Sequence, residues 1–445
     1  MEKEDKYKGS KSAYSSCVDY TLIPTDVTTT ASLLSPVYPE NTSILDEKSP
    51  ITIRVPSSSS MYTALNESYL YIKCAIKNTD GTDLAENTEI AFCENAFASL
   101  FESCNVEINS TVVTKRSANL YQYQYYLENF LGTSPLVKTS SMTSEMFYED
   151  VGSTFTNSNT GYLKRKKLSA KSKSVELIGR ISSGITTQSR YLPPNTQVTF
   201  VLRRSPAVFS LVGRSIAGKN CPYQIEFQKI VYYVKRYTVN PLVTAKHLKI
   251  IAQDKPTNTI MAHDKRLNFP IIANEMRVFN VSVGSKQILS DSLFNGPLPN
   301  FIVIAILQEK AMNGDLTISP FKFVKHGLEA VNISVDGVTN QFREIPCADD
   351  ETLLAYKSLL DVIPKQNHGI TKDDFDNSKF LVAMRLTPAY AEKKFNLSVK
   401  GQVRLALTFS EPTKESFNVL VFGQFTSLVQ IGRSGRVISD QMVIG

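Results

Sequence analysis

Short segments in which apolar and polar residues alternate recur along most of this chain. The clearest is Ile51-Thr-Ile-Arg-Val55, which stands between two prolines, and the wholly apolar run Phe301–Leu307 is typical of a strand buried on both faces. Turn-forming pairs separate such segments, as at Asn109-Ser110 and Asp336-Gly337. Many short strands separated by turns predict an all-β protein of sandwiches or barrels. We expect strands at residues 51–55, 69–76, 106–108, 111–114, 197–203, 225–235, 276–283, 301–307, 332–335, 338–341, 403–409 and 417–425.

Two segments follow a helical period instead. Residues 119–131 end at a glycine and place on one face Leu120, Tyr123, Leu127 and Phe130. Residues 352–363 end before a proline and place on one face, at the same spacings, Leu353, Tyr356, Leu360 and Ile363. Each segment follows the tight turn of its own half. The order strand, turn, strand, helix, long loop and two closing strands therefore occurs twice, which predicts a duplicated domain because solenoid repeats are far shorter.

The duplication predicts two tandem jelly-roll β-sandwiches, each with a short inserted helix. Two Greek keys per half account for the number of strands and the long central loops, although periodicity alone does not separate this arrangement from an immunoglobulin-like tandem. We place the boundary near Asn240-Pro241. The predicted parts are an extended Ser/Thr/Pro-rich N-terminal arm (1–48), a first jelly roll (49–240), a second jelly roll (241–432) and a C-terminal tail (433–445).

Composition narrows the class of protein. Of 445 residues, 42% are hydrophobic and 20% charged, which is ordinary for a globular chain. The formal net charge of +7 permits weak, non-specific contact with DNA but does not require it. No apolar run approaches the roughly 20 residues that span a bilayer. The charged start predicts no secretory signal, so we expect the six dispersed cysteines to be reduced thiols.

Motifs for catalysis or cofactor binding are missing from the sequence. It contains no G-x-S-x-G, P-loop or H-E-x-x-H motif, and its four histidines stand far apart. We therefore predict no catalytic, cofactor or metal site. Asp373, Asp374 and Asp376 lack the glycine and terminal glutamate of a calcium loop, so a solvated turn is the favoured interpretation.

The strongest charge run is Lys164, Arg165, Lys166 and Lys167. It is a candidate nuclear import signal and, less favoured, a contact for packaged DNA. A solvated loop tip is the simpler interpretation and is preferred. Four tyrosines of the first predicted helix could instead stack on bases, but helical spacing favours packing. This spacing places Tyr123 toward the core, and the other three tyrosines are left to contact neighbouring molecules or elements: Tyr121, Tyr125 and Tyr126.

Several stretches, in conserved order along the chain, resemble the hexon-like major capsid proteins of Polinton/Maverick elements and adintoviruses. They are residues 49–56 (SPITIRVP), 100–109 leading to 121–131, 297–307 with 313–316, 319–321 and 335–337, and 418–422 (NVLVF). Ser319 stands where the family often has Asn, and neither the loop 147–174 nor the arm matches the family. These departures leave open an adintovirus, a Polinton or an adomavirus-like hexon.

The resemblance implies a double jelly-roll capsid protein that is not an enzyme and needs no cofactor. It implies a homotrimeric, pseudo-hexameric capsomer of an icosahedral shell around double-stranded DNA. Expected partners are further copies of the chain, penton proteins and minor capsid proteins, and the expected location is the virion after assembly in the host nucleus. The main alternative is a cellular tandem β-sandwich that binds carbohydrate or protein. The absence of tryptophan weakens its lectin form. A hydrolase on a β scaffold is a further alternative, disfavoured by the missing motifs.

Overall fold

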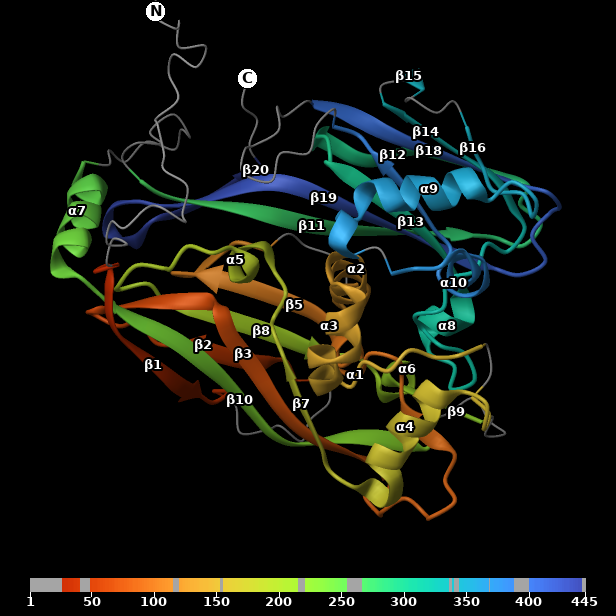
Figure 1. Ribbon diagram of the computed structural model, residues 1–445, viewed down its shortest axis with the longest axis horizontal. Helices are drawn as coiled ribbons and strands as arrows, with labels where there is room; N and C mark the ends of the chain where they lie inside the picture. Colours follow the sequence, from red (N-terminus) through yellow and green to blue (C-terminus); the bar gives the residue numbers. More distant parts are fainter. Residues whose placement is uncertain are drawn as a thin grey trace, which may run out of the picture.

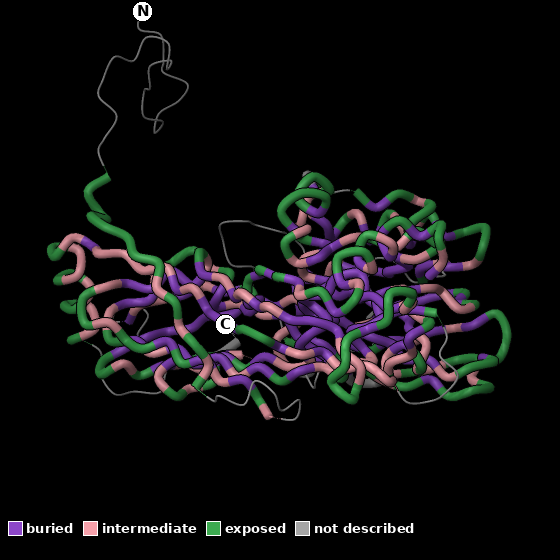
Figure 2. The backbone as a smooth tube through the Cα atoms, turned by 90° about the horizontal axis from the view of Figure 1, so that it is seen from below, coloured by how far each residue is buried: buried purple, intermediate pink, exposed green. Residues whose placement is uncertain are grey.

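The computed structural model describes residues 26–40, 49–114, 120–152, 155–214, 221–253, 266–335, 338–339, 344–367, 369–387 and 400–441. The strands lie in two groups, one on each side of helix α2, Tyr121–Gly132 (Figure 1). Buried residues run without interruption through both groups (Figure 2), so one continuous apolar core holds the described chain together.

The first group forms a sandwich of two four-stranded sheets, ordered β1-β10-β3-β7 and β2-β8-β5-β6. A short pair, β4 and β9, stands beside it. Its strands are β1 Thr29–Val37, β2 Ile51–Val55, β3 Met61–Asn78, β4 Ile90–Phe92, β5 Phe101–Ile108, β6 Thr111–Val112, β7 Val175–Gly179, β8 Val198–Arg204, β9 Leu211–Gly213 and β10 Tyr223–Val239.

The second group forms another sandwich, with sheets ordered β11-β19-β13-β17 and β12-β18-β14-β15. Strand β20 extends the first of these sheets by pairing with β19, and β16 pairs with β14 in the other. The strands are β11 Leu267–Val281, β12 Gln287–Pro297, β13 Phe301–Gln308, β14 Leu328–Val335, β15 Val338–Thr339, β16 Ile345–Pro346, β17 Leu381–Arg385, β18 Lys400–Phe409, β19 Phe417–Ile431 and β20 Val437–Gln441.

Both sandwiches have the same strand order. With the added strands β4, β9, β16 and β20 set aside, each sandwich has eight strands in chain order. Numbered from one to eight, they form in each sandwich one sheet in the order 1-8-3-6 and another in the order 2-7-4-5. We call the 1-8-3-6 sheets the first outer sheet (β1-β10-β3-β7) and the second outer sheet (β11-β19-β13-β17). The repetition predicted from the sequence is thus present strand by strand.

Helices fill the connections between these strands. The α-helices are α1 Ala96–Ser99, α2, α3 Pro135–Thr139, α4 Thr160–Ser169, α5 Gly184–Thr187, α6 Ala207–Ser210, α7 Pro241–Ala252, α8 Glu309–Asn313, α9 Leu353–Val362 and α10 Lys372–Asn377. Single 3-10 turns are η1 Ser141–Glu145, η2 Ala170–Ser172, η4 Lys365–Asn367 and η5 Arg433–Gly435.

The predicted N-terminal arm contains a strand. β1 pairs antiparallel with β10 along its length, for example Leu34 with Lys235, so residues 29–37 are the first strand of the first sandwich. Its side chains are nearly all exposed, because it is an edge strand held through backbone hydrogen bonds. It therefore lacks the alternation by which strands are predicted. Residues 1–25 and 41–48 of the predicted arm lie outside the described residues, and part of the predicted tail forms β20.

The two predicted helices are present. The predicted face of α2 is buried, but burial extends well beyond it, and the buried side of α9 differs from the one expected. α2 is buried almost all round, because it lies between the two sandwiches and not on the surface of one. The expectation that Tyr121, Tyr125 and Tyr126 are left for contacts with neighbours is wrong, since all three are buried. α9 buries Ala355, Leu359 and Val362 and leaves Leu353 69% exposed. Its predicted face was therefore wrong, by about one residue.

Candidate functional site: the junction between the sandwiches

Aromatic rings carried by α2 pack against the second sandwich. The ring of Tyr126 stacks on Phe321 with centroids 4.2 Å apart and planes 7° from parallel. Tyr123 meets the same Phe321 ring edge-on at 5.9 Å, and Phe323 also contacts Tyr126. Aromatic pairs of this kind add to the stabilisation from simple burial. The helix that the sequence assigns to the first half thus holds the two halves together.

A buried ion pair crosses the same junction. The ammonium group of Lys379, from the second sandwich, donates to both carboxylate oxygens of Glu94, from the first, at 2.7 and 3.0 Å. The hydroxyl group of Tyr126 donates to Glu94 at 2.8 Å and lies 2.6 Å from the Lys379 nitrogen. Burial raises the pKa of Glu94, and the Lys379 ammonium opposes that rise. Both side chains are more than nine-tenths buried, so each depends on the other for charge compensation.

Backbone and amide contacts add to the junction. The backbone N–H of Gly213 donates to the carbonyl oxygen of Leu316 at 2.6 Å, and the Asn367 amide donates to the carbonyl oxygen of Gly132 at 2.6 Å. A Cβ atom at Gly184 would lie 2.4 Å from the carbonyl oxygen of Ile272. Only glycine therefore allows α5 to approach strand β11 so closely.

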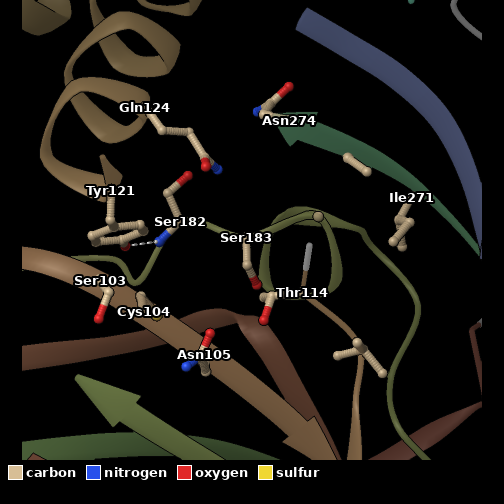
Figure 3. A pocket seen from close by; sticks show the side chains of 13 residues that line it. Ser103, Cys104, Asn105, Thr114, Tyr121, Gln124, Ser182, Ser183, Ile271 and Asn274 are labelled. Atoms are coloured by element: carbon tan, nitrogen blue, oxygen red, sulfur yellow. Dashed lines mark hydrogen bonds between the residues drawn. The ribbon is translucent and has the colours of Figure 1, made fainter. Parts of the chain in front are cut away.

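A small cavity lies where α2, α5 and β11 meet (Figure 3). Gln124 reaches into it from α2 and Asn274 from β11, and the Ser182 N–H donates to the Tyr121 hydroxyl at 2.9 Å. Its volume of about 40 Å³ leaves room for ordered water but not for an organic substrate.

A larger groove of about 500 Å³ lies beside α2. Leu127, Glu128 and Leu131 of α2 form one wall, and the end of α9 forms another. The floor is the outward face of the second outer sheet, with Phe301 and Phe422. This groove is lined mostly by apolar side chains.

The basic run does not form a loop tip. It lies on α4, where Arg165 is completely buried: it donates to the carbonyl oxygen of Phe92 at 2.8 Å and pairs with Asp150 at 2.5 Å. Lys166 pairs with Glu89 at 2.6 Å, and only Lys164 and Lys167 are well exposed. The preferred interpretation as a solvated loop tip is therefore wrong. The import hypothesis stays a prediction, and it now requires α4 to open or the receptor to recognise two lysines.

Within the described residues, no three His, Cys, Asp or Glu side chains gather into a metal-binding group. The two described histidines are far apart and have structural surroundings. His247 hydrogen-bonds the Tyr62 hydroxyl at 2.9 Å, and His326 packs on Phe417, where burial lowers its pKa to about 4. His263 and His368 lie outside the described residues. No helix in the described part of the chain has the length and apolarity needed to cross a membrane.

Solved structures share this arrangement across nearly the whole chain. A chain of the Sputnik virophage superposes with a TM-score of 0.67 at 12% identity, covering 98% of this chain and 94% of that one. The Faustovirus major capsid protein gives 0.62 at 9% identity, covering 94% and 92%. The mavirus major capsid protein gives 0.51 at 12% identity, covering 99% and 95%. This chain has the double jelly-roll fold. The fold class predicted from the sequence is confirmed.

Sequence comparison is less informative about this double jelly roll. No protein-family model matches the chain. An uncharacterized protein of Caenorhabditis elegans is 22% identical over 381 residues, which cover 83% of this chain and 86% of that protein. The similarity of the solved structures therefore concerns the fold, and the assignment of function depends on what the double jelly roll presents to other molecules.

Sequence reasoning missed the residues that join the two sandwiches. Glu94 and Lys379 stand 285 positions apart, and nothing in the local sequence of either predicts a partner. One signal was available for α2, because eleven of the twelve residues at 120–131 are apolar, aromatic or amide residues. Such a helix is hydrophobic nearly all round, which is typical of a helix covered on every side.

Proposed function

We propose that this chain is the major capsid protein of a double-stranded DNA virus or of a virus-like element integrated in a host genome. Three copies would form a capsomer with six similar sandwiches, and capsomers would tile an icosahedral shell. The observation that carries the proposal is the duplication itself. Two sandwiches of identical strand order, rigidly joined in one chain, give an arrangement close to six-fold when three copies close into a ring.

The solved double jelly rolls support the same function, since the Faustovirus and mavirus chains are major capsid proteins. Neither of the two cavities described above points to a competing function, because the larger groove is mostly apolar and the small cavity has room only for ordered water. The nematode relative favours an element resident in an animal genome, as the resemblance to Polinton and adintovirus hexons implies. Penton proteins, minor capsid proteins and weak contacts with packaged DNA are the partners we propose with it.

Molecular mass and particle outline test the proposal together. Purified protein should have the mass of a trimer in multi-angle light scattering and a hexagonal outline in negative-stain micrographs. A stable monomer at millimolar concentration would contradict the capsid function. It would favour the alternative, a cellular tandem β-sandwich that binds carbohydrate or protein.

A further inference from the structure

Each half of the chain has one helix at an equivalent place in the duplicated fold, but only one of these two helices packs on the other half. Helix α2 lies between the fifth and sixth strands of the first sandwich, β6 and β7. Helix α9 lies between the corresponding strands of the second sandwich, β15 and β17. The two helices therefore hold equivalent places in the duplicated fold.

Helix α2 covers the outward face of the second outer sheet. Pairing across that sheet aligns Asn274, Gln424, Phe301 and Arg385 in one row. All four line the spaces next to α2. The next row consists of side chains that are at most 1% exposed, namely Met276, Phe422, Val303 and Ala383.

The first outer sheet has an equivalent outward face that is only partly covered. Tyr69 pairs with Tyr233 on this face, and their rings lie 5.3 Å apart. Tyr71 pairs with Ile178, which is 40% exposed, and Leu34 at the sheet edge is 41% exposed. The three tyrosines are themselves partly exposed. A face that is rich in Tyr and aliphatic residues, on a sheet with an open edge strand, has the composition of a protein interface.

Helix α9 has a matching uncovered side. Its inner side packs on its own sandwich through Ala355, Leu359 and Val362. Its outer side carries Leu353, 69% exposed, followed at helical spacing by Lys357 and Asp361. By contrast, α2 has no strongly exposed residue before its C-terminal glycine.

The charges of the two uncovered surfaces are opposite in sign. The face of the first outer sheet carries four lysines, Lys73, Lys77, Lys229 and Lys235, and two acids, Glu176 and Glu226. The outer side of α9 and the turn before it carry Asp350, Glu351 and Asp361 against one base, Lys357. Opposite charges around an apolar centre steer the association of two surfaces and fix their register.

We propose that α9 of one copy docks on the first outer sheet of a second copy, as α2 docks on the second outer sheet within the chain. The inference rests on the proposed function and identifies the surfaces that close the trimer. In a ring of three, each chain supplies one internal contact through α2 and one external contact through α9. Six equivalent contacts then alternate around the ring.

Cysteine cross-linking tests which surfaces meet. The variant Leu34→Cys/Leu353→Cys, treated with a long bis-maleimide, should run as covalent dimers and trimers on a denaturing gel. Leu289→Cys/Leu353→Cys is the matched control, because Leu289 is 64% exposed on β12 of the other sheet, and it should stay monomeric on the gel. Each single variant measures the background from the native cysteines.

Leu353→Asp adds a test in solution. The residue is exposed in the single chain, so its replacement should leave the circular dichroism spectrum unchanged. The trimer should nevertheless dissociate at protein concentrations at least tenfold above those of the wild type. If the wild type forms trimers, but Leu353→Asp dissociates no more easily and the Leu34/Leu353 pair does not cross-link, the docking inference is wrong and the capsid function stands. A wild-type chain that never forms trimers would overturn both.

Discussion

Removing the Lys379 ammonium should destabilise the junction in a way that depends on pH. In Lys379→Met, Glu94 keeps its buried position but loses the group that compensates its charge. A carboxyl group in that position holds a proton instead of ionising, because desolvation disfavours the charged form. The folded-state pKa of Glu94 is then raised further above its ordinary value of 4.5.

The size of the effect follows from proton linkage. A group whose pKa is raised by folding destabilises the protein as pH rises above the unfolded-state pKa, because only the unfolded chain releases the proton. Each pH unit above 4.5 costs about 1.4 kcal/mol until the folded-state pKa is reached. Because burial already raises the pKa of Glu94 in the wild type, these costs are upper limits for the deficit of the variant relative to the wild type: below about 1 kcal/mol at pH 5 and no more than about 3 kcal/mol at pH 7. The second figure agrees with the roughly 3–5 kcal/mol measured when a buried pair loses one partner.

Urea unfolding at pH 5 and pH 7, followed by circular dichroism, would measure both deficits. Lys166→Met is the matched control, because it removes an ammonium 2.6 Å from Glu89 in a partly exposed pair. That change should cost about 1 kcal/mol or less at both pH values. The double variant Glu94→Gln/Lys379→Met should recover much of the loss at pH 7, since no charge remains to be buried. Equal deficits at the two pH values, or a deficit no larger than that of the control, would show that Glu94 is not held ionised by Lys379.

Two further predictions concern elements whose positions were not expected. Leu359→Asp should yield insoluble protein because it places a charge on the buried side of α9. Leu360→Asp, at a partly exposed position, should remain soluble. Equal solubility of the two variants in a cell lysate would contradict the assignment of Leu359 to the buried side of α9. Deleting residues 1–25 should impair particle assembly but leave the melting temperature of the trimer within about 2 °C of the wild type. Deleting residues 1–40 should also lower the melting temperature, because that deletion removes β1. Equal melting temperatures of the two deletion variants in a thermal scan would place β1 outside the cooperative fold.

Strands with regular alternation could be predicted closely from the sequence. The segment 51–55 coincides with β2, and the apolar run 301–307 lies within β13. The turn at Asn109-Ser110 has positive φ at both residues, as the tight hairpin requires. In these cases a local feature of the sequence matches the backbone conformation: alternate burial in β2, burial of every position in β13, and residues that tolerate positive φ in the turn.

Elements that depend on a distant partner were harder to predict. β1 is a strand because β10 offers it hydrogen bonds about 200 residues away, and its own exposed side chains contain no period. The burial of Arg165 depends on Asp150 and on two backbone carbonyl groups, so the sequence shows only a basic run. The contacts of such residues depend on the topology of the fold, so the local sequence pattern does not predict them.

The two helices show how a duplicated fold can carry different sequences for one purpose. Within the chain, the neighbour of α2 is always present, so every side of α2 can be apolar without exposing that surface to water. If α9 docks on a second copy as proposed, its outer side must remain soluble until that copy arrives, which accounts for the combination of Leu353 with Lys357 and Asp361. An interface that forms after folding keeps charges at its rim, whereas an interface that forms with the fold does not need them. On this argument, the loss of equivalence between α2 and α9 is a consequence of assembly, and it is expected in any duplicated chain that closes into a ring.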